Sequence, residues 1–233
     1  MKRSKRYQNL DKTYDRRTEY ELEDAFNLVT KFATAKFDES VETAICLGVD
    51  PRKSDQMVRG SVSLPHGTGK QVRVLVLCKP VKEDEARQAG ADMVGLEDYI
   101  EKIQSGWAEM DVVVATPDVM SMVGRLGKVL GPRGLMPNPK IGTVTFDIGP
   151  AIKELKAGKV SFKVDKTANV HVAIGKASFE PAKLRENFEA LIRVLLKMRP
   201  PTAKGQFLKG VSISSTMGPG INLNRNSVLN LIK

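Results

Sequence analysis

The first apolar pattern in the chain has the spacing of a helix. Thr18 followed by Glu21 has the spacing of a capping box, in which each side chain bonds a free backbone amide of the first turn. The apolar residues behind this pair recur at intervals of three and four: Leu22, Ala25, Phe26, Val29 and Ala33. The pattern predicts a helix that begins after Thr18 and buries one face.

The next segment, residues 40–48, alternates instead, which is typical of a half-buried strand. One side of this strand would carry Val41, Thr43, Ile45 and Leu47, and the other side Ser40, Glu42, Ala44 and Cys46. A second strand is expected over residues 58–64, ending in the turn sequence LPHGTGK.

The middle of the chain has a different hydrophobic pattern. Short β-branched runs predict strands at residues 72–78, 112–115 and 143–147, and helical segments are expected between them around residues 83–89, 96–104 and 117–130. Pro117 and Pro150 stand where the first turn of a helix accepts proline. Nearly continuous apolar strands that alternate with helices favour a small parallel sheet covered on both faces.

Strands return after Gly158. We expect strands at residues 159–164 and 169–174, a helix that opens at Pro181, and a strand over 207–216. Neither end of the chain would make a convincing core alone, so we expect residues 1–66 and 159–233 to fold together as domain one, with residues 67–158 inserted as domain two. The predicted fold class is α/β, with a discontinuous two-layer domain and an inserted, Rossmann-like three-layer domain.

Charge is distributed unevenly over these segments. The net charge of +10 divides into +1 for residues 1–66, zero for residues 67–158 and +9 for residues 159–233. From Ala190 to Lys233 there are seven basic residues and no Asp or Glu. A surface that attracts polyanions without repelling them is typical of nucleic-acid binding, although a basic protein can also be merely soluble.

Motifs for catalysis or cofactor binding are absent from the sequence. The stretch around Gly67–Lys70 fails the phosphate-loop pattern, since Leu64 replaces the first glycine and Gln71 the Ser or Thr. The two histidines are about a hundred positions apart, and Cys46 and Cys78 fit reduced core residues. We therefore expect neither an enzyme nor a metal or cofactor; a small-molecule enzyme using domain two and a DNA-binding regulator are the alternatives.

Two loops combine backbone geometry with polar chemistry. LGPRGLMPNPK, residues 130–140, contains three prolines and two glycines with Arg133 and Lys140, which favours a stiff loop that presents cations to RNA or, equally, a rigid connector. SSTMGPG, residues 214–220, gathers hydroxyls and glycines that can bring backbone amides close to a phosphate or sugar. No run approaches the roughly 18 apolar residues of a membrane span, and the N-terminus lacks the apolar core of a secretory signal, so a soluble cytoplasmic protein is expected.

Six segments in this order and spacing resemble the ribosomal protein L1 family of bacterial type: ATAKFDESVE, VRGSVSLPHGTGKQVRVLV, VVATPDVM, LGPRGLMPNPK, AGKVSFKVDKTANVHVAIGKASF and STMGPG. The resemblance implies two α/β domains joined by a hinge. It implies binding to large-subunit ribosomal RNA at the mobile stalk near the tRNA exit site, help in releasing deacylated tRNA, and translational repression through the protein's own operon mRNA. It further implies a protein that is monomeric when free and works on the cytoplasmic ribosome, an organellar ribosome not being excluded.

The same resemblance assigns an RNA-binding set in domain one: Lys36, Phe37, Ser40, Glu42, Asp165, Lys166, Thr167, His171, Ser215, Thr216, Met217 and Gly218. Arg133 and Lys140 are expected to make a secondary RNA contact. The one departure from the family pattern is SST where relatives often have TTT, and this change keeps the hydroxyls. The residue types suit an A-form groove, which displays 2′-hydroxyls and phosphates more than base edges, because short hydroxyl side chains and backbone amides can approach it closely.

Overall fold

The helix expected near the N-terminus is α2, Leu22–Phe32, in the computed structural model, which describes residues 5–10 and 12–231. Its buried face consists of Leu22, Ala25, Phe26, Val29 and Phe32. The capping-box prediction was wrong: Glu21 precedes the helix without a side-chain cap, and the Thr18 hydroxyl donates to Asp15 Oδ2 instead. The residues between them, Glu19–Tyr20, form the short strand β1, so this segment belongs to a sheet rather than to a helix start.

The described residues fall into two compact units. Unit 1 comprises Met1–Gly69 and Val160–Lys233, and unit 2 comprises Lys70–Lys159. Each unit has a hydrophobic core of its own, because the buried cluster of unit 1 shares no residue with the two buried clusters of unit 2. Both units combine helices with sheets, so the fold class is α/β.

Unit 1 is built on a five-stranded sheet in the order β1-β10-β9-β2-β8. Its longer strands are β2, Ser40–Leu47, β8, Asn169–Lys176, and β9, Leu208–Ser215, which confirm three predicted strands. β2 pairs antiparallel with β8 on one side and with β9 on the other. The strand β10, Ile221–Leu223, which was not predicted from the sequence, continues the sheet and pairs in parallel with β1.

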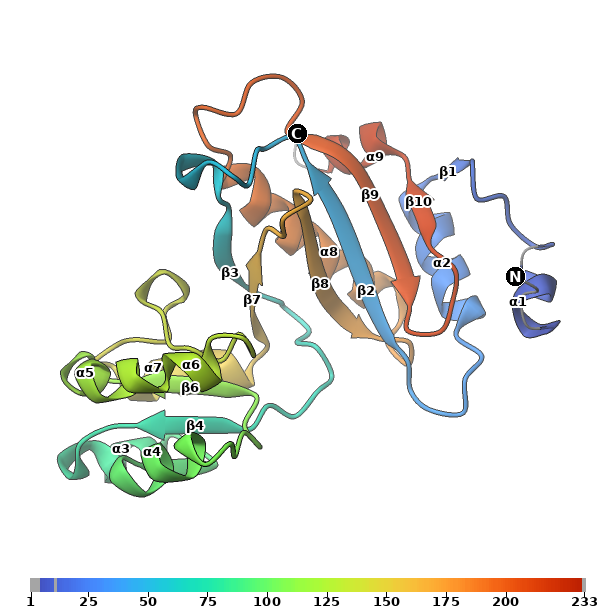
Figure 1. Cartoon of the computed structure of the whole chain (residues 1–233). Helices are drawn as coiled ribbons and strands as arrows, with labels where there is room; N and C mark the ends of the chain where they lie inside the picture. The colour runs from blue at the N-terminus through green and yellow to red at the C-terminus, as the bar shows by residue number, and fades with distance from the viewer. Residues whose placement is uncertain (1–4, 11, 232–233) are drawn as a thin grey trace. The chain divides into compact units, whose positions relative to one another are not determined.

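Among the described residues, the helices α2 and α8, Pro181–Lys197, cover one face of this sheet. α2 and α8, the predicted second long helix, pack together through Phe26 and Phe188, whose ring centroids are 5.7 Å apart. The inward residues of β2 are buried beneath them, as the alternating pattern predicted. Figure 1 shows both helices behind the sheet, so the opposite face of β2, β8 and β9 is left without a helix.

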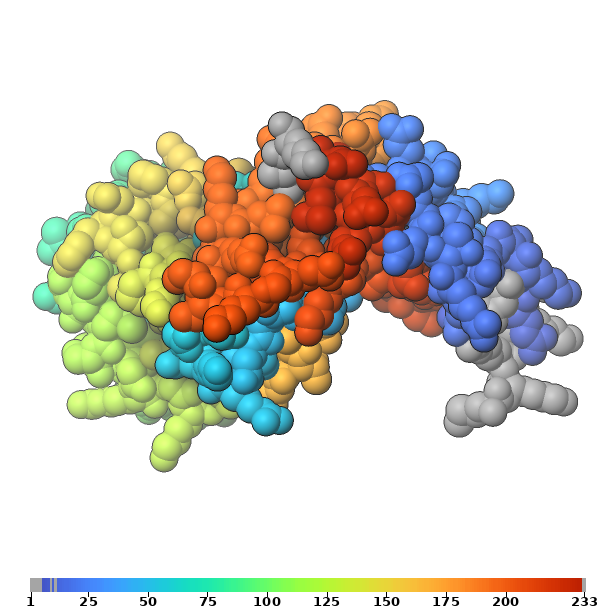
Figure 2. Space-filling view, turned by 90° about the horizontal axis from the view of Figure 1, so that it is seen from above, coloured from blue at the N-terminus to red at the C-terminus, as the bar shows by residue number. Residues whose placement is uncertain are grey.

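The remaining elements of unit 1 are short. β3, Arg59–Ser63, and β7, Lys159–Lys163, form a two-stranded sheet, and α1, Lys5–Leu10, η1, Ser54–Gln56, and α9, Arg225–Asn230, lie outside both sheets. The buried side chain of Gln56 accepts a bond from the Asp50 amide and donates to the Thr202 carbonyl. Segments from opposite ends of the chain therefore meet here, as Figure 2 shows for the cyan and orange residues.

Unit 2 contains a three-stranded parallel sheet in the order β5-β4-β6. Its strands are β4, Val74–Leu77, β5, Met93–Gly95, and β6, Val112–Ala115. Alternate residues of β4 face different cores: Leu75 and Leu77 pack on the side of α4, Glu97–Gln104, and Val74 and Val76 on the side of α3, Glu83–Gln88, and α7, Ile148–Lys156. The sheet is therefore covered on both faces, as the continuous apolar runs indicated.

The structure confirms one expectation for unit 2 and contradicts another. Residues 117–130 are helical throughout, as expected, but they alternate between 3-10 and α geometry: η3, Pro117–Val119, α5, Met120–Val123, η4, Gly124–Leu126, and α6, Gly127–Leu130. Two glycines, which are poor helix formers, stand where this geometry changes. The strand predicted at 143–147 is reduced to one bridge between Ala115 and Val144, because Thr143 exchanges local bonds with Asn138. Two further short turns of helix are η2, Pro80–Lys82, and η5, Pro139–Ile141.

The two cysteines occupy different environments. Cys78 is a free, buried thiol, as expected, and burial raises its pKa. Cys46 was expected in the core but is only half-buried, because it points to the open face of β2. In the part of the chain that the structure describes, there is no helix with the length and apolar character needed to cross a membrane.

Asp111 holds the first residues of unit 2 in place through three hydrogen bonds. Its carboxylate accepts bonds from Lys70 Nζ at 2.7 Å, from the Arg73 amide at 3.0 Å and from Arg73 Nε at 3.2 Å. Burial is the largest single influence and raises the pKa of Asp111, but the bonds from Lys70 and Arg73 together lower it from 3.8 to about 2. The folded state therefore binds a proton at this carboxyl less readily than the unfolded chain does.

We expect Asp111→Asn to lower the free energy of unfolding by about 1–2 kcal/mol at pH 7. Because the folded-state pKa is depressed, this contribution is present above pH 3.8 and is lost as the pH falls toward 2. Urea titrations followed by the fluorescence of Trp107, the single tryptophan of the chain, measure the effect in unit 2. Glu101→Gln, on an exposed side of α4, is the control, and a wild-type advantage that persists undiminished at pH 2 would contradict this account.

Candidate nucleic-acid interface

Two loops from opposite ends of the chain meet where β2 begins and β9 ends. The Thr216 amide donates to the Ser40 carbonyl at 3.0 Å, and the Ser40 amide donates to the Thr216 hydroxyl, also at 3.0 Å. The same hydroxyl lies 3.3 Å from the Ser40 carbonyl. Of the predicted site residues, Ser40 and Thr216 are thus joined directly, and the bonds close the turn at residues 216–218 against the segment at residues 33–40.

A carboxylate that the sequence did not single out lies between these loops. Glu39 is 1% exposed; its Oε1 accepts a bond from the Ala35 amide and its Oε2 accepts one from the Met217 amide, both at 2.9 Å. Burial alone would raise the pKa of Glu39, but the amide bonds from Met217 and Ala35, the nearby Ser215 hydroxyl and the charge of Arg6 outweigh it and hold the pKa below its ordinary value. A glutamate in a polar loop carries no sequence signal of burial, which is why it was missed.

Arg6 joins the same two loops from the outside. Its Nη2 donates to the Met217 carbonyl at 2.6 Å and its Nη1 donates to the Thr34 hydroxyl at 3.3 Å. Arg6 was not among the predicted site residues, because a basic residue in an N-terminal charge run is indistinguishable by sequence from its neighbours. Its contacts place α1 beside the candidate interface.

Two large apolar side chains project from the joined loops. Phe37 is 55% exposed and Met217 is 51% exposed, although each sits in a segment held by several bonds. Lys36, next to Phe37, is exposed as well. Exposed apolar groups beside a cation suit contact with a base or a ribose, since both present apolar surface next to phosphate.

Ser215 and Gly218 support the turn from inside. Ser215, one of the predicted site residues, is 3% exposed and therefore has almost no surface to offer a large partner. A Cβ at position 218 would lie 2.4 Å from the Ser215 hydroxyl oxygen, a distance that real Cβ atoms essentially never show. Any larger residue at 218 would force the Ser215 hydroxyl to move, so glycine allows the close packing of the turn.

The open sheet face carries mostly small side chains. Glu42 lies opposite Ala173 of β8 and Ser214 of β9, and the next outward residue, Ala44, lies between His171 and Ser212. A groove of about 400 Å³ runs over this face, and its lining includes Ala44, Cys46, Asn169, His171, Ser212 and Asn222. Short side chains allow the close approach that groove recognition in RNA requires.

The predicted residues Asp165–Thr167 form a closed turn at the far end of the sheet. Asp165 Oδ1 accepts bonds from the Thr167 amide, the Thr167 hydroxyl and the Asn169 amide, each at 2.8 Å. These bonds, the one from Asn169 first, lower the pKa of Asp165, and His171 Nε2 lies 3.6 Å from Asp165 Oδ2. Lys166 is exposed, so it is the member of this turn that can meet a phosphate.

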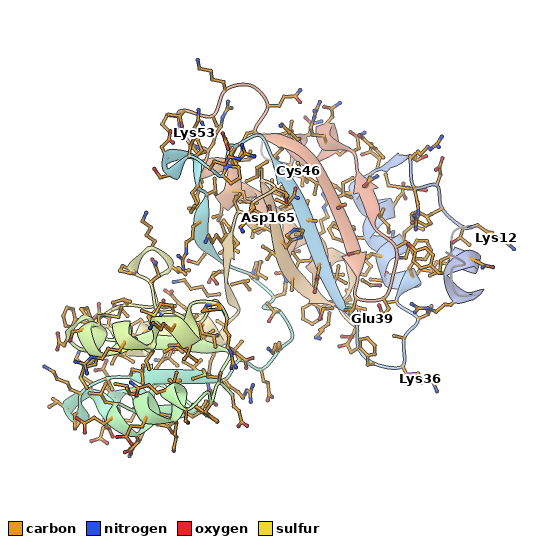
Figure 3. The ribbon with its side chains drawn as sticks, viewed as in Figure 1. Lys12, Lys36, Glu39, Cys46, Lys53 and Asp165 are labelled. Carbon is orange, nitrogen blue, oxygen red and sulfur yellow. The ribbon has the colours of Figure 1, made fainter. Side chains whose placement is uncertain are left out.

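The predicted set is therefore not one compact cluster. Ser40 lies opposite Lys176 at one end of the β2–β8 pair, and Cys46 lies opposite Asn169 at the other. Figure 3 shows Lys36 and Glu39 at one end of the sheet, and Cys46 and Asp165 toward the other. At about 3.3 Å per residue the two ends are about 20 Å apart. We call the surface that runs along the open face, from the joined loops to the turn at Asp165–Thr167, the track.

The two remaining predicted contacts belong to unit 2. Arg133 and Lys140 are both exposed, and neither makes an ion pair with another described residue. Gly134 adopts a left-handed φ of 72°, and the Asn138 side chain accepts a bond from the Lys140 amide, so the loop has a defined shape. Among the residues described, no cluster of His, Cys, Asp and Glu could hold a metal ion.

Comparison with known proteins bears on this interface. A model of the ribosomal protein L1p/L10e family matches residues 29–219, a range that contains both joined loops, the open strands and all of unit 2. The large ribosomal subunit protein uL1 of Chlorobaculum tepidum is 55% identical to this chain over 222 residues, which cover 95% of this chain and 96% of that protein. The chain belongs to the ribosomal protein L1p/L10e family.

Proposed function

We propose that the protein is a structural constituent of the large ribosomal subunit that binds large-subunit ribosomal RNA through the open sheet face of unit 1. The observation that carries this proposal is the pair of joined loops, which hold Phe37 and Met217 exposed at one end of the open sheet face. Farther along the same face lies the groove that includes Ala44, Cys46 and Ser212 in its lining. Family membership supports the same function.

Electrostatics favours unit 1 as the main binding unit. It contains 24 Lys and Arg against 15 Asp and Glu, whereas unit 2 contains 13 and 12. Of the two acids in the joined loops, Glu39 is buried and bonded to amides, so it exposes little negative charge to a phosphate backbone. Asp38 is exposed, and its carboxylate accepts bonds from the Ser178 amide and hydroxyl. General attraction would come from the cations, and discrimination from the uncharged groups of the track.

Unit 2 would add a secondary RNA contact through Arg133 and Lys140. The segment from Val119 to Phe146 contains no acid, so these cations lie in a stretch without local charge compensation. We further propose that the protein binds exit-site tRNA at the mobile stalk and assists its release, and that it represses translation by binding its own operon mRNA. A messenger that presents the same groove to the same track would compete with ribosomal RNA.

We propose that units 1 and 2 are two domains with boundaries close to those expected, residues 1–66 with 159–233 and residues 67–158. Their separate cores support this division. The protein would be monomeric when free, would need no cofactor and would act in the cytoplasm on the ribosome, an organellar ribosome also being compatible with the sequence.

The residues at the carboxyl end of β4 argue against an enzyme that binds a phosphate-containing substrate in unit 2. Rossmann-like folds bind phosphates at the carboxyl end of a central strand, through a glycine-rich turn and a helix N-terminus. Here β4 is followed by Lys79–Lys82 without a glycine, and the first turn of α3 contains Glu83, Asp84 and Glu85, which would repel a phosphate. We therefore propose that the protein is not an enzyme.

Filter binding over a range of salt concentrations tests the main proposal. The wild-type chain should bind a large-subunit ribosomal RNA stem more tightly than random RNA of equal length, and more tightly than the DNA version of the stem, which lacks the 2′-hydroxyls. The operon mRNA should compete with the stem. Equal affinity for the stem and random RNA would refute RNA specificity, and equal affinity for the DNA version would favour a DNA-binding regulator.

Thr216→Val should weaken binding of the ribosomal stem by about 1–3 kcal/mol, because the Ser40 amide loses its acceptor and the turn loosens. The change should leave binding to random RNA nearly unaltered. Thr30→Val removes a hydroxyl whose bonds lie within α2, and it serves as the matched control. Equal losses in the two variants would mean that Thr216 has no special part in the interface.

The double variant Arg133→Gln/Lys140→Gln should reduce the steepness of the salt dependence. Each phosphate contact that is lost lowers the slope of log affinity against log salt by about 0.7–0.9. Lys102→Gln, a charge removal on α4 of the same unit, is the control. A slope that is identical in all three proteins would remove unit 2 from the RNA contact.

A further inference from the structure

A buried carboxylate next to a polyanion-binding surface requires a physical reason. Glu39 adds negative charge where phosphate is expected, and it lies directly between the two loops that expose Phe37 and Met217. Burial of a charge costs free energy unless the group is fully hydrogen-bonded. The bonds that Glu39 makes must therefore do something that an uncharged side chain would not.

These bonds join segments that are remote in sequence. Oε1 accepts from the Ala35 amide, two residues before Phe37, and Oε2 accepts from the amide of Met217 itself, 178 positions away in the chain. The backbone of Glu39 is held as well, since its carbonyl accepts a bond from the Ala177 amide at 2.7 Å. The Glu39 side chain therefore sets the distance between the Ala35 amide and the Met217 amide, and it has little freedom to move.

Only an ionised carboxylate matches the groups it faces. Both partners are N–H donors, and an ionised carboxylate offers acceptors at both oxygens. A glutamine in the same position would turn one NH₂ group toward a backbone N–H, so one of the two loops would lose its partner. An aspartate is one methylene shorter and cannot reach both amides from the same backbone position.

We propose that Glu39 is a positioning residue that sets RNA specificity without touching RNA, by fixing Phe37 and Met217 in one arrangement on the track. The inference rests on the proposed RNA-binding function. Two exposed apolar side chains on independent loops would have to be ordered when RNA binds, at a cost in entropy. Loops that are already joined avoid this cost, and the gain applies only to an RNA whose shape fits both side chains.

A role as a charge and a role in positioning predict opposite changes in RNA affinity for the substitution Glu39→Gln. If Glu39 acts only as a negative charge near RNA, Glu39→Gln removes repulsion and every RNA binds more tightly. If Glu39 positions the loops, Glu39→Gln weakens the RNA that fits both loops and leaves the rest unchanged. Asp38→Asn is the matched control, because Asp38 is an exposed neighbour whose carboxylate accepts bonds from Ser178 rather than from the joined loops.

The experiment measures the affinity of the wild type, Glu39→Gln and Asp38→Asn for the ribosomal RNA stem and for random RNA, each over a range of salt concentrations. We expect Glu39→Gln to lose about 10- to 100-fold in affinity for the stem, to bind random RNA as well as the wild type or better, and to keep the same salt slope. Asp38→Asn should show no loss for either RNA. Amide hydrogen exchange at Ala35 and Met217 should become faster in Glu39→Gln alone.

Several results would overturn the inference. The first is that Glu39→Gln binds the stem as tightly as the wild type does, and the second is that it loses affinity equally for both RNAs. If Glu39→Gln does not fold, Glu39→Asp, which keeps the charge, takes its place; unchanged discrimination between the two RNAs by that variant is then the contradicting result. If the wild type itself shows no preference for the stem over random RNA, the proposed function fails and the inference fails with it. If the wild type and Glu39→Gln prefer the stem to the same degree, the inference alone is refuted.

Discussion

The position of β2 between β8 and β9 is the constraint on which the rest of unit 1 depends. A strand from the N-terminal third of the chain is hydrogen-bonded on both sides to strands from the C-terminal third, so neither end of the chain can complete this sheet without the other. The same pairing brings the loop before β2 to the turn after β9, and it exposes one face of three strands. The candidate interface is therefore a consequence of strand order rather than of any local motif.

That arrangement separates attraction from discrimination. The cations of unit 1 are spread over its surface and act on any polyanion. The groups that could distinguish one RNA shape from another lie on the track: hydroxyls, small side chains, two exposed apolar residues and backbone held at fixed spacing. The hydrogen bonds of Glu39 and Thr216 set that spacing, which accounts for the burial of the Glu39 carboxylate.

Unit 2 shows how much of the structure local sequence patterns can predict. The continuous apolar runs at β4 and β6 correctly indicated a parallel sheet with two covered faces, because each strand residue is buried whichever way it points. The same reasoning failed at residues 143–147, where Thr143 exchanges bonds with Asn138 and the expected strand is reduced to a single bridge with Ala115. Competition from a nearby backbone partner decided this case.

By itself the sequence determined the elements with strong periodicity and the α/β class, since alternation and helical spacing are local properties. Net charge, an additive property, indicated a polyanionic partner, and the family resemblance specified RNA. The sequence also placed Phe37 and Met217 among the candidate residues through that resemblance. Only the tertiary structure decided that Ser215 is buried, that Asp165–Thr167 lie about 20 Å from the joined loops, and that Glu39 links them. These facts depend on hydrogen bonds between residues up to 178 positions apart, and no pattern within one segment can specify its partner in another.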